Sequence, residues 1–120
     1  MAALYVLPYV KAPELMQLFS ELVFLASFGH GAIGTVRQAI LSLPREWVLA
    51  RMEQEAEPLL RDGTYDEYRR FLELYELMDM ELTLKLARRA AAHADDDIRE
   101  AGEDFLAKYA QLQPGKGCAE

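Results

Sequence analysis

Three consecutive acids, Asp95–Asp97, are the residues whose type and spacing most suggest chemistry in this chain, because neighbouring carboxylates can bind a cation. A calcium-binding loop, however, alternates its ligands along the chain and turns at a glycine, and this stretch has neither feature. The acids directly precede an apolar pattern with helical spacing, where a carboxylate can accept hydrogen bonds from the first backbone amides of a helix. We therefore expect Asp97, with Glu100 three residues later, to cap a helix, and we expect no metal site.

The other residue types that serve in catalysis are few in this sequence. The two histidines, His30 and His93, lie in a glycine-containing segment and near the end of a predicted helix, and the single cysteine, Cys118, lies in a polar tail. The segment "GHGAIG" neither follows a strand pattern nor precedes the lysine of a phosphate-binding loop. Because the sequence shows no Ser/His/Asp or Cys/His arrangement, we expect loop roles for both histidines and a protein that is not an enzyme and has no cofactor.

Charged and aromatic side chains offer candidates for binding instead. One predicted helix, within residues 44–57, carries glutamates, and a later one, within residues 80–92, carries lysine and arginine. If both helices line one groove, its two sides have opposite charge and suit a protein partner; the alternative is an ordinary solvated face. The candidate partner-binding residues are Trp47, Glu53, Glu57, Lys85, Arg88 and Arg89. An aromatic row is expected in the core, with ligand binding as its alternative, and consists of Tyr65, Tyr68, Phe71 and Tyr75.

The composition is that of one folded domain with excess negative charge. Of the 120 residues, 52% are hydrophobic, and 13 basic against 20 acidic residues give a net charge of −7. That charge disfavours attraction to nucleic-acid phosphates, and a single cysteine excludes an internal disulfide. The N-terminal sequence lacks the pattern of a signal peptide, and the apolar run over residues 15–28 is too short to span a bilayer. We therefore expect a cytoplasmic protein without a membrane or nucleic-acid partner.

Prolines and glycines fall at intervals of about one helix length, whereas the alternating pattern of strands is absent. We therefore predict an all-α protein with about six helices and no sheet. The third helix should bend or end near Glu57, because Pro58 disrupts a helix interior. The predicted helices cover residues 13–28, 36–43, 44–57, 64–78, 80–92 and 97–112. The residues expected to be buried on the later helices are Val48, Leu49, Met52, Ala56, Tyr68, Phe71, Leu72, Tyr75, Met78, Leu82, Leu84, Leu86, Ala87, Ala90 and Ala91.

Capping signals at similar intervals indicate a repeat. Thr35, Thr64 and Asp97 lie about thirty residues apart, and each is followed three residues later by Gln or Glu. The outer two signals open "TVRQA" and "DIREA", which match by residue type. We predict a single helical domain over residues 1–113 and a flexible tail over residues 114–120. Within the domain, an apolar arm and a capping helix cover residues 1–30, and the repeat units cover 32–61, 64–93 and 96–112.

The stretch "DDDIREAGEDFL" resembles the first helix of a HEAT-type repeat, and "GTVRQAILSLPREWVL" resembles a full HEAT-like hairpin. The residues that match the pattern of cap, β-branched residue, arginine and small residues are Asp97, Ile98, Arg99, Ala101, Gly102 and Leu106. The resemblance covers about residues 32–112 and implies stacked antiparallel helical hairpins, as in armadillo-type proteins. It also implies that Arg37 and Arg99 pair with acids of neighbouring repeats, with Arg69 or Arg70 as the middle counterpart. Another antiparallel bundle is the alternative.

The resemblance implies a non-enzymatic adaptor or scaffold that binds another protein through a groove lined by the second helices. The acidic composition supports a different class, a small inhibitor or immunity-type protein that neutralises a basic partner. A third alternative is a homodimeric helical bundle assembled through the apolar residues 4–28. The three alternatives place the binding surface on different helices.

Overall fold

The computed structural model describes residues 11–112, which fold into seven helices without a strand. The helices are α1 (Ala12–Gln17), α2 (Phe19–Leu25), α3 (Ile33–Leu41), α4 (Arg45–Arg61), α5 (Tyr65–Met78), α6 (Met80–Ala91) and α7 (Asp96–Leu112). The predicted all-α class is therefore confirmed for this part of the chain, and none of these helices is long and apolar enough to cross a membrane. The predicted N-terminal arm within residues 1–10 and the predicted tail over residues 114–120 lie outside the described residues.

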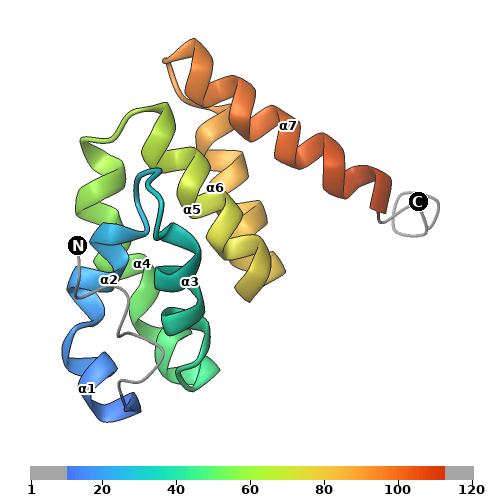
Figure 1. Cartoon of the computed structure of the whole chain (residues 1–120). Helices are drawn as coiled ribbons and strands as arrows, with labels where there is room; N and C mark the ends of the chain where they lie inside the picture. The colour runs from blue at the N-terminus through green and yellow to red at the C-terminus, as the bar shows by residue number, and fades with distance from the viewer. Residues whose placement is uncertain (1–10, 113–120) are drawn as a thin grey trace.

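Helix α5 lies at the centre of the arrangement (Figure 1). It packs against α4 on one side and against α6 and α7 on the other, while α2 packs against α3 and α4. Figure 1 shows α1 to α4 gathered on one side of the molecule and α7 at the opposite end. Stacking in a HEAT-like superhelix stays a prediction.

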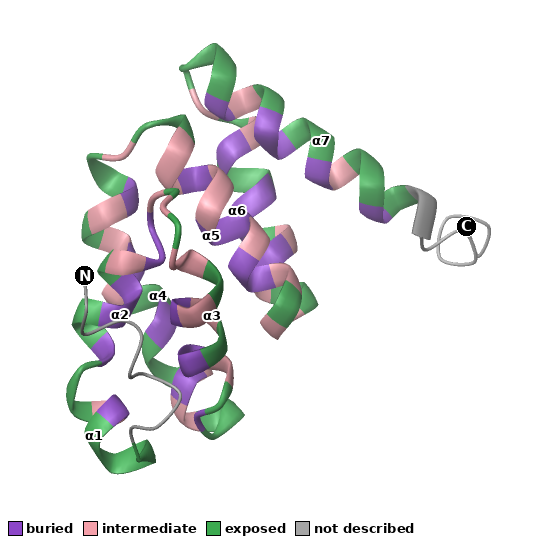
Figure 2. Ribbon diagram, in the orientation of Figure 1, coloured by how far each residue is buried: buried purple, intermediate pink, exposed green. Residues whose placement is uncertain are grey.

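The core is formed by the apolar faces that the helices turn toward one another (Figure 2). On α5, Tyr68, Phe71 and Tyr75 are buried, so these members of the aromatic row belong to the core, whereas Tyr65 is 42% exposed. Burial of each large apolar side chain contributes about 1.5–3 kcal/mol. On α4, Val48, Met52 and Ala56 are buried as predicted, together with Leu60. Two residues that were expected to be buried are only partly so, namely Leu49 and Met78.

The buried face of α6 differs in part from the prediction. Leu86, Ala87 and Ala90 are buried as expected, but the face is centred on Thr83, which is fully buried. The Thr83 hydroxyl donates a hydrogen bond of 2.8 Å to the Asp79 carbonyl oxygen, which satisfies it inside the core. The remaining predicted positions are only partly buried and are Leu82, Leu84 and Ala91. The prediction missed Thr83, because a hydroxyl that is hydrogen-bonded within its own helix can be buried as an apolar side chain is.

The predicted first helix over residues 13–28 is wrong in its length and continuity. The chain forms α1 and α2 with a break at Leu18, whose φ is −98° and ψ is 11°, and α2 ends at Leu25. This segment is apolar on more than one face, and a single straight helix cannot bury such a segment completely. Even with the break, Leu18 and Phe24 remain 42% and 51% exposed.

The first two capping predictions have opposite outcomes. The Thr64 capping box is confirmed, because the Thr64 amide donates to Glu67 Oε1 at 2.6 Å and the Asp66 amide donates to Thr64 Oγ1 at 3.4 Å. The Thr35 cap is wrong, because α3 already begins at Ile33, two residues before Thr35. Ala32, the N-cap residue of α3, offers no side-chain acceptor.

The cap of α7 is two residues earlier than predicted. Asp95 Oδ1, rather than the Asp97 carboxylate, accepts hydrogen bonds from the amides of Asp97 and Ile98 at 2.9 and 3.1 Å. The other two acids therefore lie in the first turn of α7, where negative charge is favourable. The three acids thus serve the helix end, as predicted, but with a different residue in the capping position.

Helix α4 continues past Pro58 to Arg61, so of the two outcomes expected near Glu57 the end is contradicted, and the bend stays a prediction. A proline costs most in a helix interior, where it removes a backbone donor and its ring meets the preceding turn. Pro58 lies in the last turn of α4, four residues before the C-cap residue Asp62. Pro58 still lacks the donor that would bond to the Gln54 carbonyl oxygen, and only three helical residues follow it.

Helices α6 and α7 cross at Gly102, which is buried. A Cβ atom on Gly102 would lie 2.5 Å from the Ala87 carbonyl oxygen, 2.8 Å from Ala90 Cβ and closer still to the Ala91 amide nitrogen. Gly102, one of the small residues in the matched pattern, therefore allows α6 and α7 to approach closely. Further along α7, the Tyr109 hydroxyl donates to Glu76 Oε2 of α5 at 2.5 Å. Burial and the Glu76 carboxylate raise the pKa of Tyr109 to about 12.

Candidate functional site

Four of the predicted partner-binding residues lie together between α4 and α6. Lys85 Nζ lies 2.8 Å from Glu53 Oε2, and the Arg89 guanidinium donates two hydrogen bonds to the Glu57 carboxylate at 2.6 and 3.0 Å. The hydrogen bond from Arg89 lowers the pKa of Glu57 despite the opposing effect of burial. We call these four residues and Arg88 the charged ridge. Within it, the acidic and basic helices neutralise one another.

A small cavity lies beside the ridge. It has a volume of about 130 Å³ and its lining consists of both ion pairs and the residues Leu60, Tyr75, Leu82 and Leu86. Burial, with a further contribution from the Glu53 carboxylate, raises the pKa of Tyr75. The phenol is therefore protonated at neutral pH and cannot serve there as a base.

Trp47 and Arg88 have different surroundings. The Trp47 ring packs edge-on against Phe19 of α2 with 5.1 Å between ring centroids, and Arg51 of its own helix lies 4.3 Å from its centroid. These contacts direct the ring toward α2, whereas the charged ridge lies between α4 and α6. Arg88 is exposed and forms no ion pair within residues 11–110.

A second and larger cavity was not anticipated from the sequence. It lies between the end of α3, the start of α4 and the α5–α6 junction, and its volume is about 260 Å³. We call it the apolar pocket, and its lining consists of Ile40, Leu41, Leu43, Arg45, Val48, Leu77 and Met78. Leu77 is 57% exposed, and Met80, two residues beyond this lining, is 38% exposed. Arg45, the one charged lining residue, donates hydrogen bonds to the Met78 carbonyl oxygen at 3.2 Å and to Asp79 Oδ1 at 2.5 Å.

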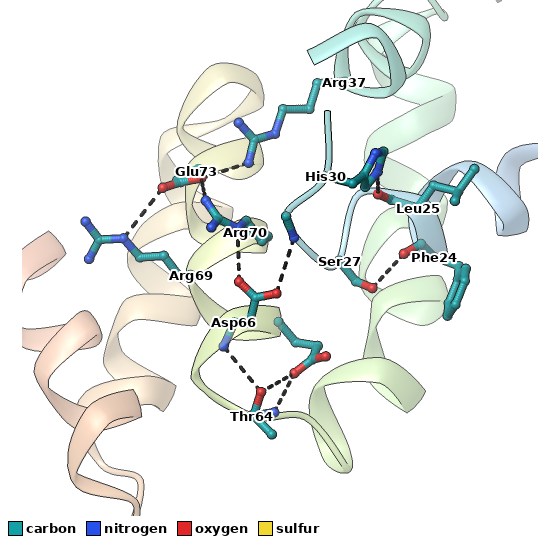
Figure 3. Close-up of polar contacts among 12 residues, drawn as sticks. Phe24, Leu25, Ser27, His30, Arg37, Thr64, Asp66, Arg69, Arg70 and Glu73 are labelled. Atoms are coloured by element: carbon teal, nitrogen blue, oxygen red, sulfur yellow. Dashed lines mark hydrogen bonds and ion pairs between the residues drawn. The ribbon is translucent and has the colours of Figure 1, made fainter. Parts of the chain in front are cut away.

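A second polar arrangement ties α3 and the α2–α3 loop to α5 (Figure 3). Arg37 Nη2 lies 2.8 Å from Glu73 Oε1, Arg70 Nη1 lies 3.1 Å from the same oxygen, and Arg69 Nε lies 3.6 Å from Glu73 Oε2. Arg70 Nε also donates to Asp66 Oδ1 at 3.1 Å, and the Asp66 carboxylate accepts from the amide of Gly29 at 3.2 Å. We call Arg37, Arg69, Arg70, Glu73 and Asp66 the Glu73 cluster.

The Glu73 cluster tests the predicted pairing of arginines between units. Arg37 does pair with Glu73, an acid of the neighbouring predicted unit, so the expected ion pair is confirmed, while the repeat stays a prediction. The expectation for Arg99 is wrong, because its guanidinium pairs with Asp96 of the same helix and donates to the His93 carbonyl oxygen. The neighbouring predicted unit over residues 64–93 supplies Arg99 with a carbonyl oxygen, that of His93, and not with an acid.

The cluster is suited to holding helices together rather than to moving protons. Burial alone would raise the pKa of Glu73, but the hydrogen bonds and charges of Arg37 and Arg70 outweigh it, and the pKa lies below its ordinary value. Burial would lower the pKa of Arg70, yet Glu73 and Asp66 raise it. Both groups are therefore fully ionised at neutral pH, where neither exchanges protons readily.

Both histidines have the predicted loop roles. The Ala32 amide donates to His30 Nδ1 at 3.2 Å, and the Asp95 amide donates to His93 Nδ1 at 2.9 Å. Among the described residues, no group of three or more His, Cys, Asp or Glu side chains is arranged to hold a metal ion.

Comparisons of the whole chain with models of protein families, with curated proteins and with solved structures find no match.

Proposed function

We propose that this chain is a non-enzymatic protein-binding module of the adaptor or scaffold kind and that the apolar pocket is its binding surface. The observation that carries the proposal is the exposure of Leu77 and Met80 beside a cavity lined almost entirely by aliphatic side chains. Apolar side chains of a partner that enter such a pocket lose contact with water, and buried anchors of this kind dominate the affinity of protein interfaces.

The size of the pocket supports a protein partner over a metabolite. Its volume of about 260 Å³ lies below the roughly 300–1,000 Å³ of typical small-molecule sites. The only charged group in its lining, Arg45, is already hydrogen-bonded to Asp79 and to the Met78 carbonyl oxygen. A polar metabolite would therefore find few unpaired groups to orient it, whereas one or two apolar side chains of a peptide would not need them.

The charged ridge remains a predicted contribution to the same function. Its two ion pairs satisfy Glu53, Glu57, Lys85 and Arg89 within the chain, so a partner that used these charges would first have to separate them. Exposed ion pairs of this kind contribute about 1 kcal/mol or less to stability. Their opening is therefore inexpensive, but their net attraction for a charged partner is weak.

The proposal is tested by affinity capture from cells that produce the protein, with variants matched for exposure. We expect Leu77→Glu to lose a partner that the parent retains, because it places a charge at the apolar pocket. Tyr65→Glu, at the other end of α5 and 42% exposed, should retain the same partner. Loss of the partner with Lys85→Glu and Arg89→Glu, but not with Leu77→Glu, would move the binding surface to the ridge.

The acidic inhibitor is a second candidate, and the outer face of α7 favours it. Four of its exposed acids form no ion pair within residues 11–110, namely Asp97, Glu100, Glu103 and Asp104. A basic partner bound to this face would be released as salt concentration rises, because exposed charges are screened within a Debye length. Binding that is insensitive to salt but sensitive to Leu77→Glu would exclude this candidate.

A further inference from the structure

We propose that the small cavity beside the charged ridge binds a primary amide group on a short aliphatic chain, and that the Tyr75 hydroxyl selects this group. The amide belongs to a small molecule or to an asparagine or glutamine side chain of a partner, and its chemistry is the same in both. The inference goes beyond the proposed function, because this cavity is separate from the apolar pocket.

The first observation is a buried hydroxyl that lacks a hydrogen bond. Tyr75 is 2% exposed and lines the cavity, yet its hydroxyl has no hydrogen-bond partner among residues 11–110. In this part of the chain, Arg37 Nε is the one fully enclosed side-chain nitrogen or oxygen without a partner, so the Tyr75 hydroxyl opens into the cavity. Buried polar groups are nearly always hydrogen-bonded. A group within the cavity should therefore bond to this hydroxyl.

The second observation is that the cavity presents an acceptor as well as this donor. Burial, with a further contribution from the Glu53 carboxylate, raises the pKa of Tyr75, so the phenol keeps its proton and donates at neutral pH. Glu53 also lines the cavity, and its ion pair with Lys85 uses Oε2, so Oε1 can accept a further hydrogen bond. A primary amide matches both groups on two separate atoms, because its oxygen accepts and its nitrogen donates.

The third observation is the charge around the cavity, which disfavours ligands of either sign. The lining contains two acids and two bases, and they are paired as Glu53 with Lys85 and Glu57 with Arg89. A charged ligand would be attracted by one member of each pair and repelled by the other, and it would lose its hydration on entry. An uncharged polar group avoids both penalties.

The fourth observation is the size of the cavity. Its volume of about 130 Å³ corresponds to roughly four water molecules at about 30 Å³ each, so the cavity accepts only a group of a few non-hydrogen atoms. The rest of the lining is aliphatic and consists of Leu60, Leu82 and Leu86. These side chains suit a short carbon chain next to the amide, and propionamide is therefore the matching probe.

Titration of the full chain with propionamide, followed by NMR of the backbone amides, tests the inference. Propionate and propionamidinium have the same shape as propionamide and carry a negative and a positive charge, so they are matched ligands. We expect propionamide to cause saturable shifts around the cavity, with a Kd on the order of 10 mM because so few atoms make contact. The two charged ligands should bind several-fold more weakly.

Two variants test the role of the hydroxyl. Tyr75→Phe removes only this oxygen, and it should weaken the binding of propionamide several-fold while the chain stays folded. The control is Tyr109→Phe, which removes a hydroxyl that is bonded to Glu76 and lies outside the lining of the cavity. This control should bind propionamide as the parent does.

Three results would overturn the inference. If no saturable shift appears at concentrations well above the expected Kd, water alone meets the Tyr75 hydroxyl. Equal binding of a charged ligand would contradict the argument from charge. Equal binding of propionamide by Tyr75→Phe would show that the hydroxyl does not select the ligand.

Affinity capture from cells separates the two sources of the amide once propionamide binds. If Tyr75→Phe captures a partner more weakly than the parent does, the amide belongs to a side chain of that partner. If parent and variant capture their partners equally, the cavity serves a small amide. Both outcomes support the site, and neither depends on Leu77→Glu, which tests the apolar pocket.

Discussion

The Glu73 side chain joins α3 to α5 through its ion pair with Arg37. It pairs with Arg37 of α3 and with Arg69 and Arg70 of its own helix, and its side chain is 26% exposed. Removing one partner from a partly buried group of this kind leaves the others desolvated and unpaired. The cluster should therefore contribute more to stability than the more exposed pairs of the charged ridge.

Glu73→Gln should lower the free energy of unfolding by about 2 kcal/mol at pH 7, since the hydrogen bonds lose their charge. Because the pKa of Glu73 is depressed in the folded chain, its contribution is present above the pKa of the unfolded chain and is lost as pH falls through the folded pKa. The difference between parent and variant should thus shrink in acid. Urea unfolding at pH 7 and at acidic pH measures this difference in stability. The substitution Glu103→Gln serves as the control.

At the scale of elements, α7 is held by two kinds of contact. Gly102 allows its backbone to approach α6, and the Tyr109 hydroxyl joins its later turns to Glu76 of α5. Lys108 Nζ adds an ion pair of 2.9 Å to the same carboxylate. The close crossing with α6 therefore works together with the contacts to α5 to keep Ile98 and Phe105 buried.

Gly102→Ala should destabilise the chain by about 3 kcal/mol or detach α7, because overpacking against backbone atoms cannot be relieved by a rotamer change. Gly34→Ala is the matched control, since Gly34 lies within α3 and a Cβ atom there meets nothing within 4 Å. Alanine at that position should instead stabilise by about 0.5–1 kcal/mol. Thermal unfolding of the two variants should shift in opposite directions; a similar shift in both would contradict the crossing.

The elements also show which features sequence reasoning can reach. The Thr64 capping box was predictable because both partners lie within four residues of each other. Asp95 could not be chosen over Asp97 in the same way, because the choice depends on how the loop folds at His93, whose Nδ1 accepts from the Asp95 amide. The ridge followed from charges on two helices, whereas the apolar pocket joins residues 40–48 to residues 77–78, which no local pattern connects.

At the scale of the whole molecule, α5 links two groups of helices, namely α1 to α4 and the pair α6 and α7. It packs against α4 on one side and against α6 and α7 on the other, and its buried residues contribute to one continuous core. Direct contact between the groups elsewhere includes the exposed ion pairs of the charged ridge. The two groups should therefore unfold together when the core of α5 is weakened.

Phe71→Ala removes a fully buried ring from α5 and should cost about 3–5 kcal/mol. We expect hydrogen exchange to accelerate together in α3 and α6, although neither helix carries the substitution. Tyr65→Ala, on the same helix but exposed, should change exchange little. Retained protection in α3 with loss only in α6 would show that the groups are independent.

The oligomeric state separates the homodimer alternative from the proposed function. Leu18 and Phe24 are exposed within the predicted interface over residues 4–28, of which 4–10 lie outside the described residues. If residues 4–28 do not form a dimer interface, light scattering should give the mass of a single chain for the parent and for Phe24→Glu alike. A doubled mass that Phe24→Glu halves would support the dimer.

The junction at Asp79 has a consequence for how this chain can change in length. One residue separates α5 from α6, and it caps α6 through Oδ2, binds Arg45 through Oδ1 and accepts the Thr83 hydroxyl through its carbonyl oxygen. Inserting one residue inside α6 just after this junction would turn the rest of the helix by about 100° and move Leu86 and Ala90 off the core. Insertions and deletions should therefore be tolerated in the α2–α3 loop, around the open position Gly31, and rejected at Asp79.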